Sequence, residues 1–349
     1  MKFGVIGHGF MGSLHVEAVK SLENMECVAV CDIDSMRLEA LDAKIKRYRE
    51  IDSLLADEEV ETVIIATPNK CHKEQVIKAA RAGKHIICEK PAAMSSSDLD
   101  DMLQAVKDNC IVFSSHLQRR LDIDFQTIKH AYECGAVGDV YLIKRMLYGY
   151  HGNMHDWHVH ISEGGGMLLD WGVHLIDQFL YLVDSPLKSI YADVRNVINF
   201  EVDDYYKVIL RFENMVTAEI ELGTYMLSDK PDWFPCHWYL CGNKGSLYVD
   251  NFEPEGKIVR TNRLLTDITD AAGRYIGPTR SFGQPEPGLI VTEEISWVPS
   301  DANDYYRNFV RAVRGKEELL VKPFEIRRTL SVLEAIWESA RTMKSVEFE

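Results

Sequence analysis

The sequence is poor in positive charge and has no long apolar run. Its 349 residues carry a formal net charge of -15, from 39 Lys and Arg residues against 54 Asp and Glu residues. An acidic body repels nucleic acid and anionic membrane surfaces. No apolar stretch approaches the length of a membrane span. These absences argue against a polyanion-binding or membrane-spanning protein, and we expect a small-molecule ligand.

The eight cysteines show neither a metal-binding nor a disulfide spacing. There is no CxxC pair, and several cysteines stand inside apolar runs. We therefore expect reduced thiols, as in a cytoplasmic protein. The chain enters an apolar strand at Phe3, so we also expect no secretory or transit segment before the fold.

The first third alternates short apolar runs rich in Val and Ile with segments of helical period. Such alternation predicts a parallel sheet covered by helices on both faces. The expected strands are 2–6, 27–31, 62–66, 85–88 and 111–115, and the expected helices are 11–23, 35–44, 72–82 and 95–108.

From residue 141 the pattern changes to consecutive strands joined by short turns. This pattern predicts an open, mostly antiparallel sheet. The expected strands are 189–198, 205–213, 215–223, 236–241 and 245–250, and the expected helices are 123–133, 168–182, 302–314 and 324–342. The stretch 251–300 is rich in Pro and Gly and predicts long loops. The length of the chain also favours two domains.

The motif Gly-x-Gly-x-x-Gly at 7–12 follows the first apolar strand and opens a helix. Asp32 ends the second strand about 20 residues further on, as in dinucleotide-binding βαβ units. Glycine permits the tight turn and lets the backbone approach a pyrophosphate at the helix start. The expected cofactor contacts here are Gly7, Gly9, Phe10, Met11, Gly12 and Asp32.

These features predict a mixed fold with two parts. Residues 1–120 are predicted as a doubly wound α/β dinucleotide-binding domain of Rossmann type, and residues 121–349 as an α+β domain for substrate binding and oligomerisation. The Asp32 carboxylate favours NAD over NADP, because it accepts ribose hydroxyls and repels a 2′-phosphate. No arginine follows Asp32 immediately, and Arg37 is expected on the next helix.

Two further turns, 66–69 and 88–91, lie at the carboxyl ends of predicted parallel strands. Sheets of this kind bind their ligands at that edge. Lys90 in the second turn can polarise a substrate oxygen as negative charge develops on it. The expected cofactor contacts in these turns are Thr67, Pro68, Asn69, His72, Glu89 and Lys90.

In the second domain, three glycines at 164–166 lead into a predicted helix. Asp170, His174 and Asp177 are spaced to share one face of that helix, which would offer an imidazole and carboxylates to one pocket. His174 lies near the positive end of the helix, where the neutral imidazole suited to a general base is favoured.

Taken in order, these motifs resemble the Gfo/Idh/MocA (glucose–fructose oxidoreductase / inositol dehydrogenase) family. The residues that carry the resemblance are the run 7–12, Cys31 to Asp34, 66–69 with His72, 82–91, and GGxLxDxGxHxxD at 165–177. The resemblance implies a nicotinamide cofactor, a cyclic polyol or pyranose substrate, and a dimer or tetramer packed through the open sheet. It also implies that Lys90, Asp170 and His174 form the catalytic set.

One departure from the family pattern concerns the segment before the glycines. Related sequences carry Trp-Arg there, whereas this chain has Trp157 and His158. We expect a substrate-lining loop in which Trp157 stacks on a sugar face. The histidines of this loop, at 151, 155, 158 and 160, lack helical spacing, so we expect no metal site. The expected substrate contacts are Lys90, His116, Trp157, His158, Asp170 and His174.

The favoured function is an NAD-dependent dehydrogenase that oxidises a secondary ring hydroxyl, at the third carbon of a pyranose. His174 would take the hydroxyl proton, Lys90 would stabilise the alkoxide, and Asp170 would orient the substrate or the imidazole. Two alternatives remain open. A redox-neutral enzyme could use a transient ketone to eliminate a glycosidic bond, and a non-catalytic protein could bind NAD as a sensor.

Overall fold

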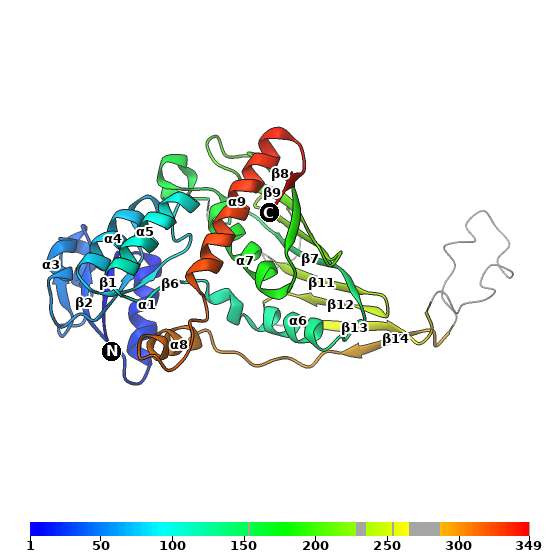
Figure 1. Cartoon of the computed structure of the whole chain (residues 1–349), viewed down its shortest axis with the longest axis horizontal. Helices are drawn as coiled ribbons and strands as arrows, with labels where there is room; N and C mark the ends of the chain where they lie inside the picture. The colour runs from blue at the N-terminus through cyan, green and yellow to red at the C-terminus, as the bar shows by residue number, and fades with distance from the viewer. Residues whose placement is uncertain (153, 228–234, 253–254, 265–286, 349) are drawn as a thin grey trace.

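The computed structural model describes residues 1–152, 154–227, 235–252, 255–264 and 287–348. Within them the chain forms two sheets, one of six strands near the N-terminus and one of nine strands further along the chain (Figure 1). This arrangement confirms the predicted fold class, an α/β part followed by an α+β part built on an open sheet.

The first sheet is parallel and has the strand order β3-β2-β1-β4-β5-β6. Its strands are β1 (Lys2–Ile6), β2 (Glu26–Cys31), β3 (Lys46–Tyr48), β4 (Thr62–Ile65), β5 (His85–Cys88) and β6 (Phe113–Ser115). Its helices are α1 (Phe10–Ser21), α2 (Ser35–Glu39), α3 (Ile51–Leu55), α4 (His72–Arg81) and α5 (Ser96–Asp108). The chain reverses its order across the sheet between β1 and β4, and at such a switch point the carboxyl ends of the strands leave a ligand crevice.

The second sheet is open and mixed, with the order β14-β13-β12-β11-β7-β10-β9-β8-β15. Its strands are β7 (Val140–Tyr148), β8 (Leu187–Arg195), β9 (Tyr205–Phe212), β10 (Thr217–Gly223), β11 (Cys236–Gly242), β12 (Gly245–Asp250), β13 (Glu255–Thr261), β14 (Ile290–Glu294) and β15 (Val346–Glu347). β7 and β10 pair in parallel, and the other described pairs are antiparallel.

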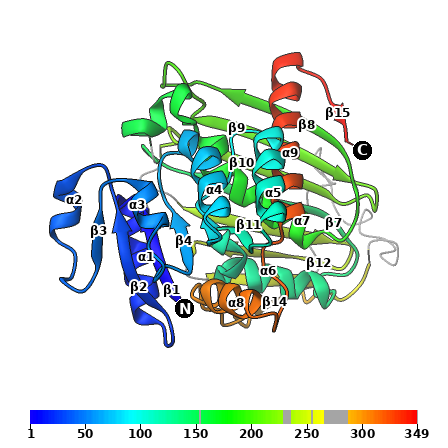
Figure 2. The same cartoon turned by 60° about the vertical axis from the view of Figure 1, so that its left-hand side comes forward.

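One face of the second sheet is covered by helices, which lie between it and the first sheet (Figures 1 and 2). The helices that follow the first sheet are α6 (Ile123–Glu133), α7 (Val173–Leu182), α8 (Asp304–Val313) and α9 (Pro323–Thr342). α8 returns to the first sheet, where the Tyr305 hydroxyl donates to the Ser115 carbonyl at 2.8 Å. None of the described helices is both long and apolar enough to cross a membrane.

The prediction of long loops over 251–300 is wrong in part. Residues 255–261 and 290–294 form the antiparallel pair β13 and β14, which extends the sheet edge, while 265–286 lie outside the described residues. The helix predicted for 35–44 ends at Glu39, and the sequence prediction missed β3, α3 and β15. These missed elements are two to five residues long, too short for a periodic pattern to identify.

Candidate active site

In the glycine turn between β1 and α1, backbone atoms pack so closely that a Cβ at Gly7 or Gly12 would clash with them. Gly7 has a φ of +91°, and a Cβ on Gly12 would lie 1.9 Å from the Gly7 carbonyl oxygen. Gly9 differs, because the nearest atom to a Cβ there would be a guanidinium nitrogen of Arg37 at 3.6 Å. Gly7 and Gly12 therefore serve the turn, and Gly9 borders open space. α1 begins beside it without a side-chain cap, so its first-turn N–H groups are available to an anion.

Asp32 lies at the end of β2, next to this turn. Its carboxylate accepts the N–H of His8 at 2.7 Å and the N–H of Asp34 at 2.8 Å, and the side chain is nearly buried. Arg37 does lie on α2, as expected, but its guanidinium turns back to within 3.7 Å of the Asp32 carboxylate. The end of β2 therefore carries the positive charge of Arg37 beside the negative charge of Asp32.

His72, predicted as a cofactor contact, joins the two other turns of the crevice. Its ring is completely buried, with one nitrogen 2.9 Å from the Pro91 carbonyl and the other 2.8 Å from the Thr67 carbonyl. Both ring nitrogens are thus used within the protein, and the prediction is corrected: His72 positions the turns that contain Thr67 and Lys90. Asn69 faces the second domain, where its amide donates to the Gly164 carbonyl at 2.8 Å. The contacts of Thr67 and Pro68 with a cofactor remain predictions.

Glu89 holds a buried cluster beneath Lys90. One oxygen of its carboxylate lies 2.8 Å from a ring nitrogen of His15 and 2.8 Å from a ring nitrogen of His116. Burial alone would raise the pKa of Glu89, but the two imidazoles hold that pKa well below its usual value. The other ring nitrogen of His15 meets the Tyr306 hydroxyl at 2.7 Å. Glu89 therefore anchors α1, β6 and α8 around the turn, and a cofactor contact for it remains a prediction.

The catalytic set predicted from the sequence comes together across the two domains. Lys90 projects from the first sheet, and its ammonium binds the Asp170 carboxylate and, at 2.9 Å, the Asp170 carbonyl. Asp170 lies on a π-helical turn (Leu168–Gly172) that precedes α7. Whereas the sequence suggested that Asp170 orients the substrate or the imidazole, in the structure it fixes the ammonium of Lys90.

His174 is buried on the first turn of α7, after the π-helical turn. Burial first, and then the positive charges of Lys90 and Arg119, hold its pKa well below the usual value, so the imidazole is neutral. Its Nδ1 is enclosed and has no hydrogen-bond partner among the described residues. A buried, unpaired imidazole nitrogen is costly and typical of a functional site.

Asp177 does not share the pocket with Asp170 and His174. Arg120 donates two hydrogen bonds to its carboxylate, at 2.6 and 2.7 Å, and a third to Glu325 of α9 at 2.9 Å. The expectation that this helix offers Asp177 to the pocket is therefore corrected. Arg120 and Asp177 form a buried ion pair that fixes α7 against α9.

The loop before the glycines places His158 near Asp170 and Lys90. Gly165 and Gly166 donate to the carbonyls of His160 and His158 at 3.1 and 3.0 Å, and a Cβ on Gly165 would lie 2.2 Å from the His158 oxygen. The glycines thus bring the loop close to Asp170. Burial lowers the pKa of His158, and the charge of Asp170 acts against that shift. Trp157 stacks on the His158 ring at 3.8 Å between centroids.

Potential metal ligands do cluster among the described residues, though not in this loop. The donor atoms of His15, Glu89 and His116 lie within 4.8 Å of one another. The hydrogen bonds of these groups account for their arrangement.

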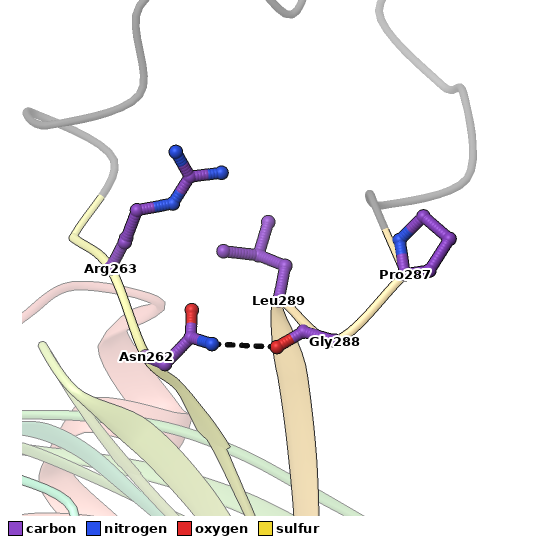
Figure 3. A pocket seen from close by; sticks show the side chains of 5 residues that line it. All are labelled: Asn262, Arg263, Pro287, Gly288 and Leu289. Atoms are coloured by element: carbon purple, nitrogen blue, oxygen red, sulfur yellow. Dashed lines mark hydrogen bonds between the residues drawn. The ribbon is translucent and has the colours of Figure 1, made fainter.

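A cavity of about 400 Å³ lies far from these residues, between the ends of β13 and β14 (Figure 3). Its walls are Asn262, Arg263, Pro287, Gly288 and Leu289. The Asn262 amide donates to the Gly288 carbonyl at 2.6 Å and so spans the cavity floor. The described walls contain neither a carboxylate nor an imidazole.

The residues around the start of α1 fit a dinucleotide. They offer the uncapped start of α1, open space at Gly9, and the carboxylate of Asp32. These are the anion site, the close approach and the ribose acceptor that NAD requires. Lys90, Asp170 and His174 then lie where the carboxyl end of β5 meets the second domain.

Sequence reasoning missed several residues of the site. His15 and Tyr306 are 291 positions apart and meet only through the fold. Arg119 stacks on Trp171, with 4.2 Å between the guanidinium carbon and the ring centre. No local pattern in the sequence signals either contact.

Comparison with known families supports the geometry. Residues 1–116 match a model described as an oxidoreductase family with an NAD-binding Rossmann fold. Residues 125–248 match a model described as a GFO/IDH/MocA C-terminal domain.

Individual relatives include two dehydrogenases and an NAD-binding protein. A myo-inositol 2-dehydrogenase of Thermotoga maritima is 27% identical over 288 residues, which are 79% of this chain and 81% of that protein. A scyllo-inositol 2-dehydrogenase (NADP(+)) of Bacillus subtilis is 24% identical and covers 100% of this chain and 96% of its own. The crystal structure of an NAD-binding protein from Listeria innocua superposes with a TM-score of 0.85 at 35% identity, covering 99% of this chain and 96% of that chain.

Proposed function

Because the chain belongs to the Gfo/Idh/MocA family of NAD-binding oxidoreductases, we propose that it oxidises a secondary ring hydroxyl of a sugar, glycoside or inositol, at the third carbon of a pyranose. The observation that carries this proposal is the convergence of Lys90, Asp170 and His174 beside the dinucleotide crevice. The inositol dehydrogenases among its relatives support the class of substrate.

Each residue of this set has a chemical role in the proposal. The neutral imidazole of His174 accepts the proton of the substrate hydroxyl. The ammonium of Lys90 stabilises the alkoxide that forms, and Asp170 keeps that ammonium in place. When bound, NAD accepts the hydride released from the same carbon. Trp157 and His158 line the substrate side, with a flat ring for the apolar face of a sugar.

The proposal extends to the assembly and its location. The face of the second sheet away from the helices carries Met146, Tyr239 and Tyr191 among cross-strand ion pairs such as Lys144 with Glu219 at 2.9 Å. A broad face of this mixed character suits a homo-oligomer interface. All eight cysteines are free, which supports a reducing cytoplasmic setting.

A sugar panel tests the function. Purified protein with NAD is assayed for NADH formation against pyranoses, glycosides and inositols, and active substrates are then labelled with deuterium at single ring carbons. Transfer of label from the third carbon to NAD supports the proposal, whereas transfer only from the first carbon makes the protein an aldose dehydrogenase. Cleavage of a glycoside without net NADH would instead assign the redox-neutral elimination.

The His174→Ala variant tests in the same assay whether the activity depends on His174 as the general base. It should lose about 100-fold or more in turnover, the usual contribution of a general base, while its NAD affinity stays the same. Near-normal turnover would remove His174 from the role of base.

A further inference from the structure

Arg119 lies close to the proposed base, and part of its guanidinium edge forms no hydrogen bond with the described residues. It lies on the short helical segment η2 (Gln118–Leu121) after β6, and its backbone carbonyl accepts the Gln178 amide of α7 at 2.6 Å. Its guanidinium lies over Trp171 at 4.2 Å and over Phe252 at 5.3 Å, measured to the ring centres. The residue is therefore held from both its backbone and its side chain.

Trp171 connects this guanidinium to the catalytic set. The indole stands edge-on to the His174 imidazole, with 6.4 Å between their centroids. The positive charge of Arg119 also contributes to lowering the pKa of His174, after burial and Lys90. Arg119 is thus within electrostatic reach of the reacting centre, one aromatic ring away from the base.

Stacking occupies the faces of the guanidinium and leaves its edge for hydrogen bonds in the plane. Asp122 accepts one of these bonds, from Nη1 at 2.9 Å. Within the described part of the chain, Nε and Nη2 form no hydrogen bond, and neither is enclosed. Burial raises the pKa of Asp122, and the charge of Arg119 acts against that shift.

We propose that Arg119 binds a carboxylate of the substrate, so that the proposed dehydrogenase acts on a sugar acid of the hexuronate class in preference to a neutral sugar. The planar edge of a guanidinium matches the two oxygens of a carboxylate. A rigid, stacked arginine also loses little side-chain freedom when it binds. This inference rests on the proposed function and adds the charge of its substrate.

Binding of a matched ligand pair tests the assignment without requiring turnover. The NADH-loaded protein is titrated by calorimetry with methyl α-D-glucopyranosiduronate and with methyl α-D-glucopyranoside, which differ only in the carboxylate at the sixth carbon. We expect the wild-type protein to bind the uronide at least about 10-fold more tightly, as for a charge-assisted bidentate pair. Equal affinities, or tighter binding of the neutral glycoside, would overturn the inference.

Variants of Arg119 separate its charge from its shape. Arg119→Gln should abolish the preference for the uronide, and Arg119→Lys should retain part of it, because an ammonium keeps the charge without the planar edge. The ratio of the two affinities is the readout, so a general loss of binding does not imitate the result. Arg327→Gln removes a surface arginine paired with Asp100 and should leave the ratio unchanged. A ratio that Arg119→Gln does not change would contradict the proposal.

Turnover of the same two ligands with NAD distinguishes this inference from the proposed function. NADH formation from the neutral glycoside at the higher efficiency refutes the carboxylate assignment and keeps the dehydrogenase. If neither ligand nor any member of the sugar panel yields NADH, the dehydrogenase proposal fails, and the calorimetric ratio still decides whether Arg119 binds a carboxylate.

Discussion

The ammonium of Lys90 is bound twice by Asp170, through the side-chain carboxylate and, at 2.9 Å, through the backbone carbonyl. The two residues come from different domains, since Lys90 follows β5 of the first sheet and Asp170 precedes α7. The pair therefore sets the position of the ammonium and links the first sheet to the helices that cover the second sheet.

Lys90→Ala and Asp170→Asn should show non-additive effects on turnover. Each single variant should lower kcat/KM by about 100-fold or more, because each removes the positioned ammonium from the alkoxide. The double variant should lose little beyond the worse single variant, since both changes remove the same interaction. Steady-state kinetics of the three variants supply the measurement, and fully multiplicative losses would show that the residues act separately.

Gly9→Ala should separate cofactor binding from folding. A Cβ at Gly9 meets no described atom closer than 3.6 Å, so the variant should keep its melting temperature within a few degrees. NAD affinity should fall about 10-fold or more, because the added methyl occupies space that the backbone leaves for the pyrophosphate. Gly12→Ala is the matched contrast, since its Cβ would lie 1.9 Å from the Gly7 oxygen and should disrupt the turn itself. Unchanged NAD affinity in Gly9→Ala would place the pyrophosphate elsewhere.

NAD should bind more tightly than NADP, and Asp32 should be the cause. The Asp32 carboxylate repels a 2′-phosphate, but Arg37 stands 3.7 Å away and offsets part of that repulsion. Asp32→Ser should therefore narrow the ratio of the two dissociation constants by about 10-fold or more, and Arg37→Ala should widen it. Fluorescence titration of both cofactors measures this ratio. Tighter binding of NADP by the wild-type protein would contradict the prediction.

Stability should fall with rising pH because of one buried carboxyl group. Burial raises the pKa of Asp203 to about 7 from an ordinary value near 3.8, and the side chain accepts the Leu168 N–H at 2.7 Å at the start of the π-helical turn. Between these two values the folded chain binds a proton that the unfolded chain has released, so this stabilisation is present below pH 4 and is lost as the pH rises through 7.

The Asp203→Asn variant tests the effect in thermal melts from pH 5 to pH 9. An amide cannot ionise and can still accept the Leu168 N–H, so above pH 7 the variant should melt higher than the wild type by about 2 °C or more. Asp204→Asn is the neighbouring control. Its carboxylate accepts the N–H groups of Val197, Ile198 and Asn199, so the amide should lower the melting temperature. Parallel melting profiles for Asp203→Asn and the wild type would refute the assignment.

The sequence predicted the parts of the site that depend on local spacing. The glycine motif and Asp32 lie within one βαβ unit, and Asp170 and His174 lie within one predicted helix. Within such short segments, the helical period and the turn residues determine where each side chain lies. Most strands and helices of both sheets also follow from these patterns. The exceptions are the short β3, α3 and β15, and the pair β13 and β14 in a stretch rich in Pro and Gly.

The remaining parts of the site depend on contacts between distant segments. Glu89 and His15 are 74 positions apart, and the stack of Arg119 on Trp171 joins two domains. The sequence shows that these residues can bear charge or stack, but not with which partners. His72 illustrates the resulting error, since a polar residue at a ligand rim proved to be fully engaged with backbone carbonyls.

α8 follows the second sheet in the chain but packs against the first sheet, beside the proposed cofactor site. Tyr305 bonds to Ser115 and Tyr306 to His15, yet both tyrosines lie beyond β14 in the chain. The packing of the nucleotide-binding part, residues 1–116, is therefore completed by a helix that follows the second sheet in the chain. A chain cut before residue 304 would lack both tyrosines, so the His15 ring and the Ser115 carbonyl would lose these buried partners.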